Sequence, residues 1–259
     1  MPEQPEVERA ARELREKLVG RAIAMVEPLH PTAGRALGAD ERRSVTGMVV
    51  TAVERRGKHQ LILLDDGRVL HAHFRMAGSW SVGATDDALP RHARLVVRLA
   101  DGGWIALVDP RALATVVLLP SMDAAPVLGP EADDPALTAA ELRRALVRRR
   151  GPIKPVLLDQ SVLAGVGNIY ASEALWRARI SPRAAANGLG TRRLATLLEG
   201  IRAALAAGAE SATRYSDGGD TRLHVYGREG EPCDRCGTPI RRTVQAGRST
   251  FFCPQCQRR

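Results

Sequence analysis

The chain has few aromatic residues, no long apolar run and few cysteines. Phe, Trp and Tyr make up 3% of its 259 residues. No apolar stretch approaches the roughly 20 residues that a membrane-spanning helix needs, and the N-terminus lacks the apolar core of a secretion signal. We therefore expect a bacterial-type cytoplasmic protein, associated with the nucleoid if it binds DNA, that has no membrane partner.

Positive charge is what the chain has in excess. It contains 38 Lys and Arg residues against 29 Asp and Glu, a formal net charge of +9. Basic side chains gain affinity for nucleic acids by displacing the counterions of the phosphates. A solvated basic surface would give the same balance, so charge makes nucleic acid a candidate partner without deciding the matter.

The hydrophobic pattern predicts a helix first and strands next. Apolar residues recur at helical spacing from Val7 to Leu18, and Gly20 stands where such a helix would end. From Ile23 to Leu119, short apolar runs alternate with turn residues, which is typical of a β-sandwich or barrel. The strands are expected at 45–53, 61–64, 69–73, 95–99 and 104–108.

The rest of the chain is predicted to be helical. Residues 120–135 are rich in Pro, Asp and Ala and indicate a linker. Thr138 and Glu141 predict a capping box at the start of the first helix beyond it. Helical patterns cover residues 138–149, 155–158, 169–177 and 191–207.

Four cysteines near the C-terminus form two closely spaced pairs, Cys233 with Cys236 and Cys253 with Cys256. Two Cys-x-x-Cys pairs separated by a hairpin-length stretch can bind one tetrahedral zinc ion. Two disulfides are the alternative, which a cytoplasmic location disfavours. Four thiolates leave no open coordination position, so we expect one structural zinc that holds a hairpin. The cysteine pattern alone does not decide whether that hairpin binds nucleic acid.

A glycine-rich turn at Gly165-Val166-Gly167-Asn168 separates two helical patterns. Free backbone N–H groups at a helix start suit a phosphate, and Asn168 is expected to cap that helix. An ordinary corner between helices would have the same pattern. Lys154 and the basic run at 143–150 favour phosphate binding.

The N-terminus reads Met1-Pro2-Glu3. If Met1 is removed, Pro2 becomes a terminal secondary amine, and because a terminal amino group titrates near pH 8, part of it is neutral and nucleophilic. Glu3 beside it is a candidate general acid or base. By itself the dipeptide equally describes the opening of a helix.

Taken together, these motifs resemble the formamidopyrimidine-DNA glycosylase and endonuclease VIII family, collinearly over nearly the whole chain. The matching segments are Pro2-Glu3, 55–58, 73–78, 109–111, 158–171 and the four-cysteine finger. The resemblance implies an α+β protein: an N-terminal β-sandwich with an N-terminal helix, then a helical helix-two-turn-helix domain carrying a four-cysteine zinc β-hairpin. The implied domains are 1–125, 126–225 and 226–259.

The resemblance also implies a monomeric, bifunctional DNA glycosylase and abasic-site lyase acting on double-stranded DNA that contains a damaged base or an abasic site. Pro2 is implied as the nucleophile and Glu3 as the acid, with Lys58 and Arg248 assisting catalysis. Met76 and Arg111 are implied to fill the gap left by the flipped nucleotide, where Leu113 replaces the usual third residue, phenylalanine. Phosphate contacts are implied for His92, Arg149, Lys154 and Asn168.

Two departures from the family pattern concern the substrate. Gln4 replaces a leucine, and the segment 212–225 is shorter than the loop that covers a flipped 8-oxoguanine. We therefore expect ring-opened purines, oxidised pyrimidines or bulkier lesions to be preferred over 8-oxoguanine. A DNA-binding protein without catalysis on the same scaffold, and a zinc-ribbon module for RNA or protein, are the competing hypotheses.

Overall fold

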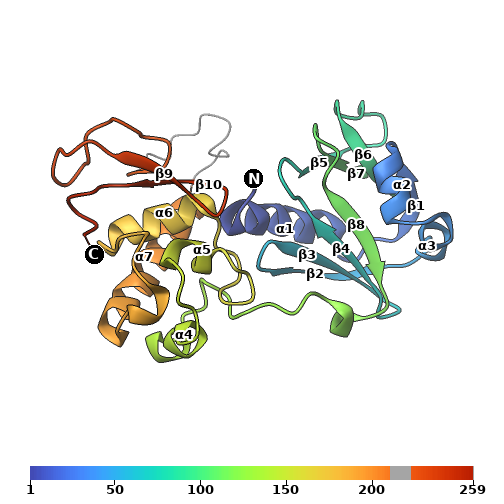
Figure 1. The fold of residues 1–259 in the computed structure, drawn as a ribbon. Coiled ribbons are helices and arrows are strands. Elements are labelled where there is room, and N and C mark those ends of the chain that lie inside the picture. The colour runs from blue at the N-terminus through green and yellow to red at the C-terminus, as the bar shows by residue number, and fades with distance from the viewer. Residues whose placement is uncertain (211–222, 259) are drawn as a thin grey trace. The chain divides into compact units, whose positions relative to one another are not determined.

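A computed structural model describes residues 1–210 and 223–258 (Figure 1). The chain divides into two compact units, Met1–Pro126 and Val127–Arg259, called here the N-terminal and C-terminal units. Among the described residues, no helix has the length and apolar character to cross a bilayer. Most of the segment 212–225, on which the expected lesion preference depends, lies outside the described residues.

The N-terminal unit is the predicted β-sandwich, built from two antiparallel sheets. One sheet has the order β1-β6-β7-β5 and the other β2-β3-β4-β8. The strands are β1 (Ile23–Pro28), β2 (Val50–Arg56), β3 (His59–Leu64), β4 (Val69–His73), β5 (Ser79–Gly83), β6 (Ala93–Leu99), β7 (Trp104–Val108) and β8 (Thr115–Leu119). Alternate residues of both sheets, such as Val97, Ile105, Ile62 and Leu70, meet in one apolar core.

The first helix, α1 (Gln4–Leu18), packs into the same core. It buries Val7, Ala11, Leu14 and Leu18, and the chain turns away at Gly20, whose φ of 83° suits glycine. This confirms the predicted N-terminal helix. Two short helices, α2 (Pro31–Ala36) and α3 (Ala39–Ser44), follow β1 and were not predicted.

The strand expected at 45–53 was placed too early. Val45 is fully buried, but it is the C-terminal cap of α3, and β2 begins at Val50 after the turn at Gly47. A buried valine is compatible with either element, so apolarity alone could not distinguish them. Strand β5 was missed because all of its residues are only partly buried, which leaves no alternation to detect.

The C-terminal unit is helical and ends in a hairpin. Its helices are α4 (Ala139–Leu146), α5 (Ile153–Leu157), α6 (Asn168–Arg177) and α7 (Thr191–Glu210), and its strands are β9 (Arg241–Gln245) and β10 (Arg248–Phe252); short 3-10 turns lie at Met122–Ala124, in the N-terminal unit, and Ala186–Gly188. The capping box is confirmed: the Glu141 amide donates to Thr138 Oγ1 at 3.2 Å and the Thr138 amide to Glu141 Oε2 at 2.9 Å.

Candidate functional site

Pro2 and Glu3 are buried immediately before α1. Glu3 is 1% exposed, and its backbone amide donates to Glu6 Oε2 at 2.8 Å. Met1 is 38% exposed, and while it is attached the Pro2 nitrogen is an amide rather than an amine. The candidate nucleophile is therefore held at a fixed helix start, and its chemistry depends on removal of Met1.

Helix α1 is tied to the second sheet by two arginines that share one carboxylate. Glu8 accepts from Arg55 Nε at 2.7 Å and from Arg15 Nη1 at 2.9 Å, and Arg15 Nε also donates to the Val53 carbonyl at 2.7 Å. Burial raises the pKa of Glu8, but the hydrogen bonds and charges of Arg15 and Arg55 outweigh it and lower that pKa below its ordinary value. These bonds fix α1 relative to β2.

Lys58 lies in the β2–β3 turn after Gly57, whose φ is 56°. The lysine is 7% exposed, so it is not a free surface residue. His59, next along the chain, belongs to a cluster of three histidines on one sheet face: His59 Nδ1 and His71 Nε2 are 2.7 Å apart, and the His59 and His73 ring centroids are 4.7 Å apart. Sequence reasoning did not identify this cluster, because it forms only when β3 pairs with β4.

The histidine cluster is held neutral. Burial, reinforced by the positive charge of neighbouring groups, lowers the pKa of His59 to about 3 and that of His73 to about 4, and it also lowers the pKa of His71. His73 Nδ1 accepts the Arg75 amide at 2.9 Å, just before Met76. The cluster therefore connects the Lys58 turn to the loop that carries Met76.

The three predicted DNA-contact residues of the N-terminal unit lie on loops between strands. Met76 follows β4, His92 precedes β6 and Arg111 follows β7. Met76 and Leu113 are 41% and 45% exposed although both are apolar. A left-handed backbone occurs in each loop, with φ of 53° at Arg75, 68° at His92 and 53° at Ala112. Such conformations are unfavourable for residues with a Cβ and concentrate at functional sites.

In the C-terminal unit, Lys154 and Asn168 meet each other. The Lys154 ammonium donates to Asn168 Oδ1 at 2.5 Å, to the Ser249 carbonyl at 2.9 Å and to Thr250 Oγ1 at 2.8 Å. Lys154 is only 1% exposed, and these bonds hold Asn168 against the hairpin. Asn168 Nδ2 donates to the Ser249 carbonyl at 3.1 Å.

The expectation that Asn168 caps α6 was wrong. Gly167 is the N-terminal cap and Asn168 is the first helical residue, so its side chain is free to turn toward β10. Gly165, with φ of 92°, provides the turn that precedes them. Arg149 is half-exposed and pairs with Asp159 at 3.2 Å, an exchangeable surface pair that a phosphate could replace.

Arg248 is exposed at the start of β10, directly after the Ala246-Gly247 turn of the hairpin. The segment leading into the hairpin is fixed to α6 by Glu173, which is 2% exposed. Its carboxylate accepts the amides of His224, Val225 and Tyr226, each at 2.9 Å. Glu173 was missed by sequence reasoning because its partners are some 50 residues away.

The four cysteines converge at the base of the hairpin, and all four sulfur atoms lie within 4.8 Å of one another. The separations of 3.4 Å, 3.5 Å and 3.9 Å between pairs match the roughly 3.8 Å edge that follows from a tetrahedron with 2.3 Å zinc–sulfur bonds. Hydrogen bonds from Thr238 lower the pKa of Cys236 to about 6, whereas burial and neighbouring thiols raise that of Cys256 to about 12. Four cysteines at this spacing can all be thiolates only with a cation between them, so the donor set fits one structural zinc.

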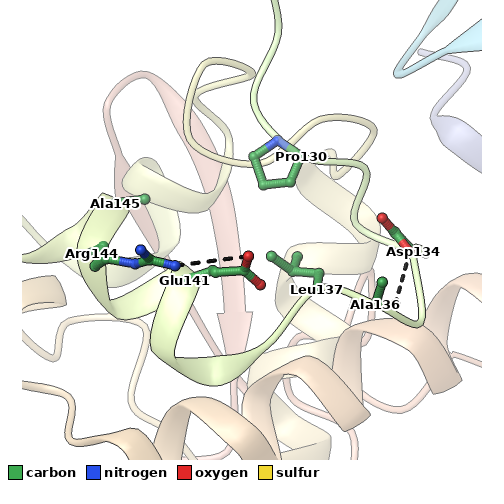
Figure 2. A pocket seen from close by; sticks show the side chains of 7 residues that line it. All are labelled: Pro130, Asp134, Ala136, Leu137, Glu141, Arg144 and Ala145. Carbon is green, nitrogen blue, oxygen red and sulfur yellow. Dashed lines mark hydrogen bonds and ion pairs between the residues drawn. The ribbon is translucent and has the colours of Figure 1, made fainter.

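The C-terminal unit also has a hollow of about 340 Å³ beside α4 (Figure 2). Its charged groups are paired locally: Arg144 lies 3.8 Å from Glu141, and Asp134 Oδ1 accepts the Ala136 amide at 2.8 Å. Both of its carboxylates are engaged in local contacts, so we assign it no catalytic role. The residues that line it are Pro130, Asp134, Ala136, Leu137, Glu141, Arg144 and Ala145.

A β-sandwich with an N-terminal helix, a helical unit and a four-cysteine hairpin define a zinc-containing protein of the helix-two-turn-helix class. Family models match three consecutive parts: the formamidopyrimidine-DNA glycosylase N-terminal domain at residues 1–116, its H2TH domain at 128–217, and the zinc finger found in FPG and IleRS at 230–259. The chain belongs to the formamidopyrimidine-DNA glycosylase family.

Individual relatives agree over the full length. Formamidopyrimidine-DNA glycosylases of Rhizorhabdus wittichii and Herpetosiphon aurantiacus are 42% and 41% identical to the chain, covering 100% and 99% of it and 100% of each relative. The Lactococcus lactis enzyme bound non-covalently to DNA containing an abasic site superposes with a TM-score of 0.90 at 32% identity, and MutM bound to DNA containing carbocyclic 8-oxo-G with 0.89 at 34%. Both comparisons cover 100% of each chain.

Removal of zinc is expected to release the hairpin and with it Arg248. A Cys236→Ser variant, or the parent treated with a chelator, should bind abasic-site DNA roughly tenfold more weakly, the loss expected for one charge-assisted phosphate contact. Titration of labelled duplex measures the affinity, and metal analysis the zinc. Val244→Ala, at a position 64% exposed on the same hairpin, is the control and should retain both. Parental affinity in a zinc-free sample would contradict the structural role.

The neutral histidines make the stability of the N-terminal unit depend on pH. Their folded pKa values lie below the ordinary 6.5, so the unfolded chain binds more protons at acid pH. The stabilisation is complete above pH 6.5 and is lost as the pH falls toward 4. The free energy of unfolding in denaturant should therefore drop between pH 7.5 and pH 5. His59→Gln should lower the number of protons taken up on unfolding in this range by up to one.

His30→Asn is the matched control for this experiment. It removes a histidine from the same unit but keeps an acceptor at the α2 cap, where His30 now accepts from Thr32. This variant should keep the parental pH dependence. A flat stability profile between pH 7.5 and pH 5 in the parent would show that the cluster is not held neutral.

Proposed function

We propose that this chain is a bifunctional DNA glycosylase and abasic-site lyase that removes oxidised or ring-opened bases and then nicks the strand. The observation that carries the proposal is full-length membership of the formamidopyrimidine-DNA glycosylase family together with Pro2-Glu3 buried at the start of α1. Related structures hold DNA containing an abasic site, an 8-oxo-G analogue or FAPY-dG. Double-stranded damaged DNA is accordingly its partner.

The proposed chemistry uses the chain's own N-terminus. After Met1 is removed, the lone pair of the Pro2 nitrogen forms a bond to C1′ of the damaged nucleotide, and the glycosidic bond breaks as the base leaves with a proton. Glu3 protonates the ring oxygen, and the opened sugar becomes an iminium ion. This cation makes the C2′ proton acidic, and loss of that proton expels the 3′ phosphate. Loss of a second proton, from C4′, then expels the 5′ phosphate. Water then releases Pro2.

The remaining residues have supporting roles in the proposal. Lys58 and Arg248 contact the phosphates beside the lesion and assist the eliminations. Met76, Arg111 and Leu113 fill the gap left by the flipped nucleotide. The exposed apolar side chains of Met76 and Leu113 are suited to wedging between bases. His92, Arg149, Lys154 and Asn168 hold phosphates, and Lys154 also donates to Asn168.

The finer assignments follow from the same proposal. We assign the β-sandwich to residues 1–125, the helix-two-turn-helix domain to 126–225 and the zinc finger to 226–259. We further infer that the protein works as a monomer in the bacterial cytoplasm, on the DNA of the nucleoid. The net charge of +9 supports association with a polyanion.

The nucleophile is tested by reducing the imine. With borohydride present, the processed parent should become covalently attached to abasic-site DNA, and Pro2→Ala should not, because a primary amine at a displaced backbone position replaces the ring nitrogen that attacks C1′. Gel electrophoresis measures the attached fraction, and mass spectrometry establishes that Met1 is absent. Pro31→Ala, at the exposed start of α2, is the control and should attach fully.

Two outcomes would contradict this assignment. Attachment of Pro2→Ala equal to that of the parent would exclude Pro2 as the nucleophile. Failure of the processed parent to attach while it still binds abasic DNA would instead support a binding protein without catalysis.

The lesion preference is tested by single-turnover excision. Because the segment 212–225 is short, fewer groups are available to read the edge of 8-oxoguanine. We expect ring-opened guanine to be removed about tenfold faster than 8-oxoguanine, the discrimination that one hydrogen bond provides. Duplexes carrying ring-opened guanine, 8-oxoguanine or an oxidised pyrimidine are compared under one condition. A dominant 8-oxoguanine rate would exclude this preference.

A further inference from the structure

A buried carboxylate lies beneath the loop that carries Arg111 and Leu113. Asp109, directly after β7, is 0% exposed. Its Oδ1 accepts the Arg111 amide at 2.9 Å, and its Oδ2 accepts the amides of Leu113 at 2.6 Å and Ala114 at 2.7 Å. A buried carboxylate is costly unless its oxygens are hydrogen-bonded, so these amides and Asp109 depend on one another.

The loop conformation that Asp109 holds is unfavourable by itself. Ala112 has a φ of 53°, in the left-handed region that residues with a Cβ avoid. Ala112 is flanked by Arg111 and Leu113, whose side chains are exposed while their amides point inward to the carboxylate. The carboxylate therefore orients two side chains outward at the expense of local backbone strain.

Asp109 also connects this loop to its neighbours. Its amide donates to the His92 carbonyl at 3.0 Å, and its own carbonyl accepts from Arg94 Nε at 2.6 Å. On the other side, a Cβ built on Gly78 would lie 2.9 Å from the Ala114 Cβ, so the Met76 loop closes directly against a residue that Asp109 holds. The loops that carry Met76, His92 and Arg111 thus meet at Asp109 and at Ala114, whose amide Asp109 binds.

We propose that Asp109 is a positioning residue that presets Arg111 and Leu113 for filling the gap in the duplex and reading the base opposite the lesion. The inference rests on the proposed function. A loop held in its working conformation before DNA arrives loses less entropy on binding and presents the guanidinium in one orientation. Without the carboxylate, Ala112 would relax to a negative φ, and the guanidinium of Arg111 would no longer be presented to the opposite base in one orientation.

The test is Asp109→Asn, which preserves shape but replaces one acceptor oxygen with an NH2 group. At least one loop amide then faces the NH2 group of the asparagine and loses its hydrogen-bond acceptor. We expect excision of ring-opened guanine opposite cytosine to fall at least tenfold, and the ratio of rates opposite cytosine and opposite adenine to fall toward one. Borohydride attachment to abasic single-stranded DNA, which has no opposite base to read, should change less than threefold.

Asp134→Asn is the matched control. Asp134 Oδ1 accepts the amide two residues ahead, as Asp109 does, but in an exposed turn of the C-terminal unit (Figure 2). It should keep the parental opposite-base ratio. Ala112→Val is a second variant that leaves the carboxylate in place and disfavours the same φ, since β-branched residues avoid the left-handed region; it should lose the ratio even if Asp109→Asn does not fold.

Rescue provides the converse result. Glycine adopts a φ of 53° without strain, so Ala112→Gly added to Asp109→Asn should restore part of the opposite-base ratio. A parental ratio in folded Asp109→Asn, or an equal fall on every duplex and on single-stranded abasic DNA, would overturn the positioning role. Either result leaves the proposed function intact if the parent still attaches to abasic DNA. If the parent does not attach, it is the proposed catalysis by Pro2 that is contradicted, not the positioning role of Asp109.

Discussion

Hydrogen bonds from backbone amides to buried carboxylates hold irregular segments in both units. Asp109 accepts three amides around residues 111–114, and Glu173 accepts three from residues 224–226. These segments form no strand or helix, so their amides have no ladder partner and would otherwise be left unpaired when buried. An ionised acceptor makes each bond shorter and stronger than one between neutral groups, so a single side chain can fix an irregular segment.

The hairpin of the C-terminal unit shows why such support is needed. Two short strands are marginal by themselves in water. Three contacts supplement them: the zinc thiolates, the Glu173 carboxylate and the Lys154 ammonium, which bonds Ser249 and Thr250 on β10. Trp176 on α6 adds an indole N–H that points at Cys233 Sγ at 3.4 Å, a bond that also orients a zinc ligand. The exposed Arg248 is therefore presented on a rigid hairpin.

Local patterns predicted those features that depend on local spacing. The cysteine pairs, the Thr138–Glu141 cap and the periodicity of α1 each follow from residues within a few positions of one another. The repeated short apolar runs predicted the sandwich. They did not predict the edge strand β5, because all of its residues are partly buried and show no alternation between buried and exposed positions. The sequence implied a phosphate contact for Lys154 without indicating that this lysine is buried.

What local patterns could not predict are contacts between distant segments. Asn168 was expected to cap its own helix, and instead it bonds a carbonyl of β10, some 80 residues away. The histidine cluster likewise forms only when β3 and β4 pair, because His59 lies on one strand and His71 and His73 lie on the other. In each case the residue type was visible, but its partner was determined by tertiary structure.

A catalytic group at a chain terminus imposes its own constraint, because the first residues of most proteins are poorly ordered. Reaction at C1′ requires the attacking nitrogen to be held within a fraction of an ångström of its productive position. Helix α1 meets this requirement by burying one apolar face from Val7 to Leu18 and by bonding Glu8 to Arg55 of β2. The rigidity of the sandwich thereby extends to Pro2, which is the position that the proposed mechanism requires of its nucleophile.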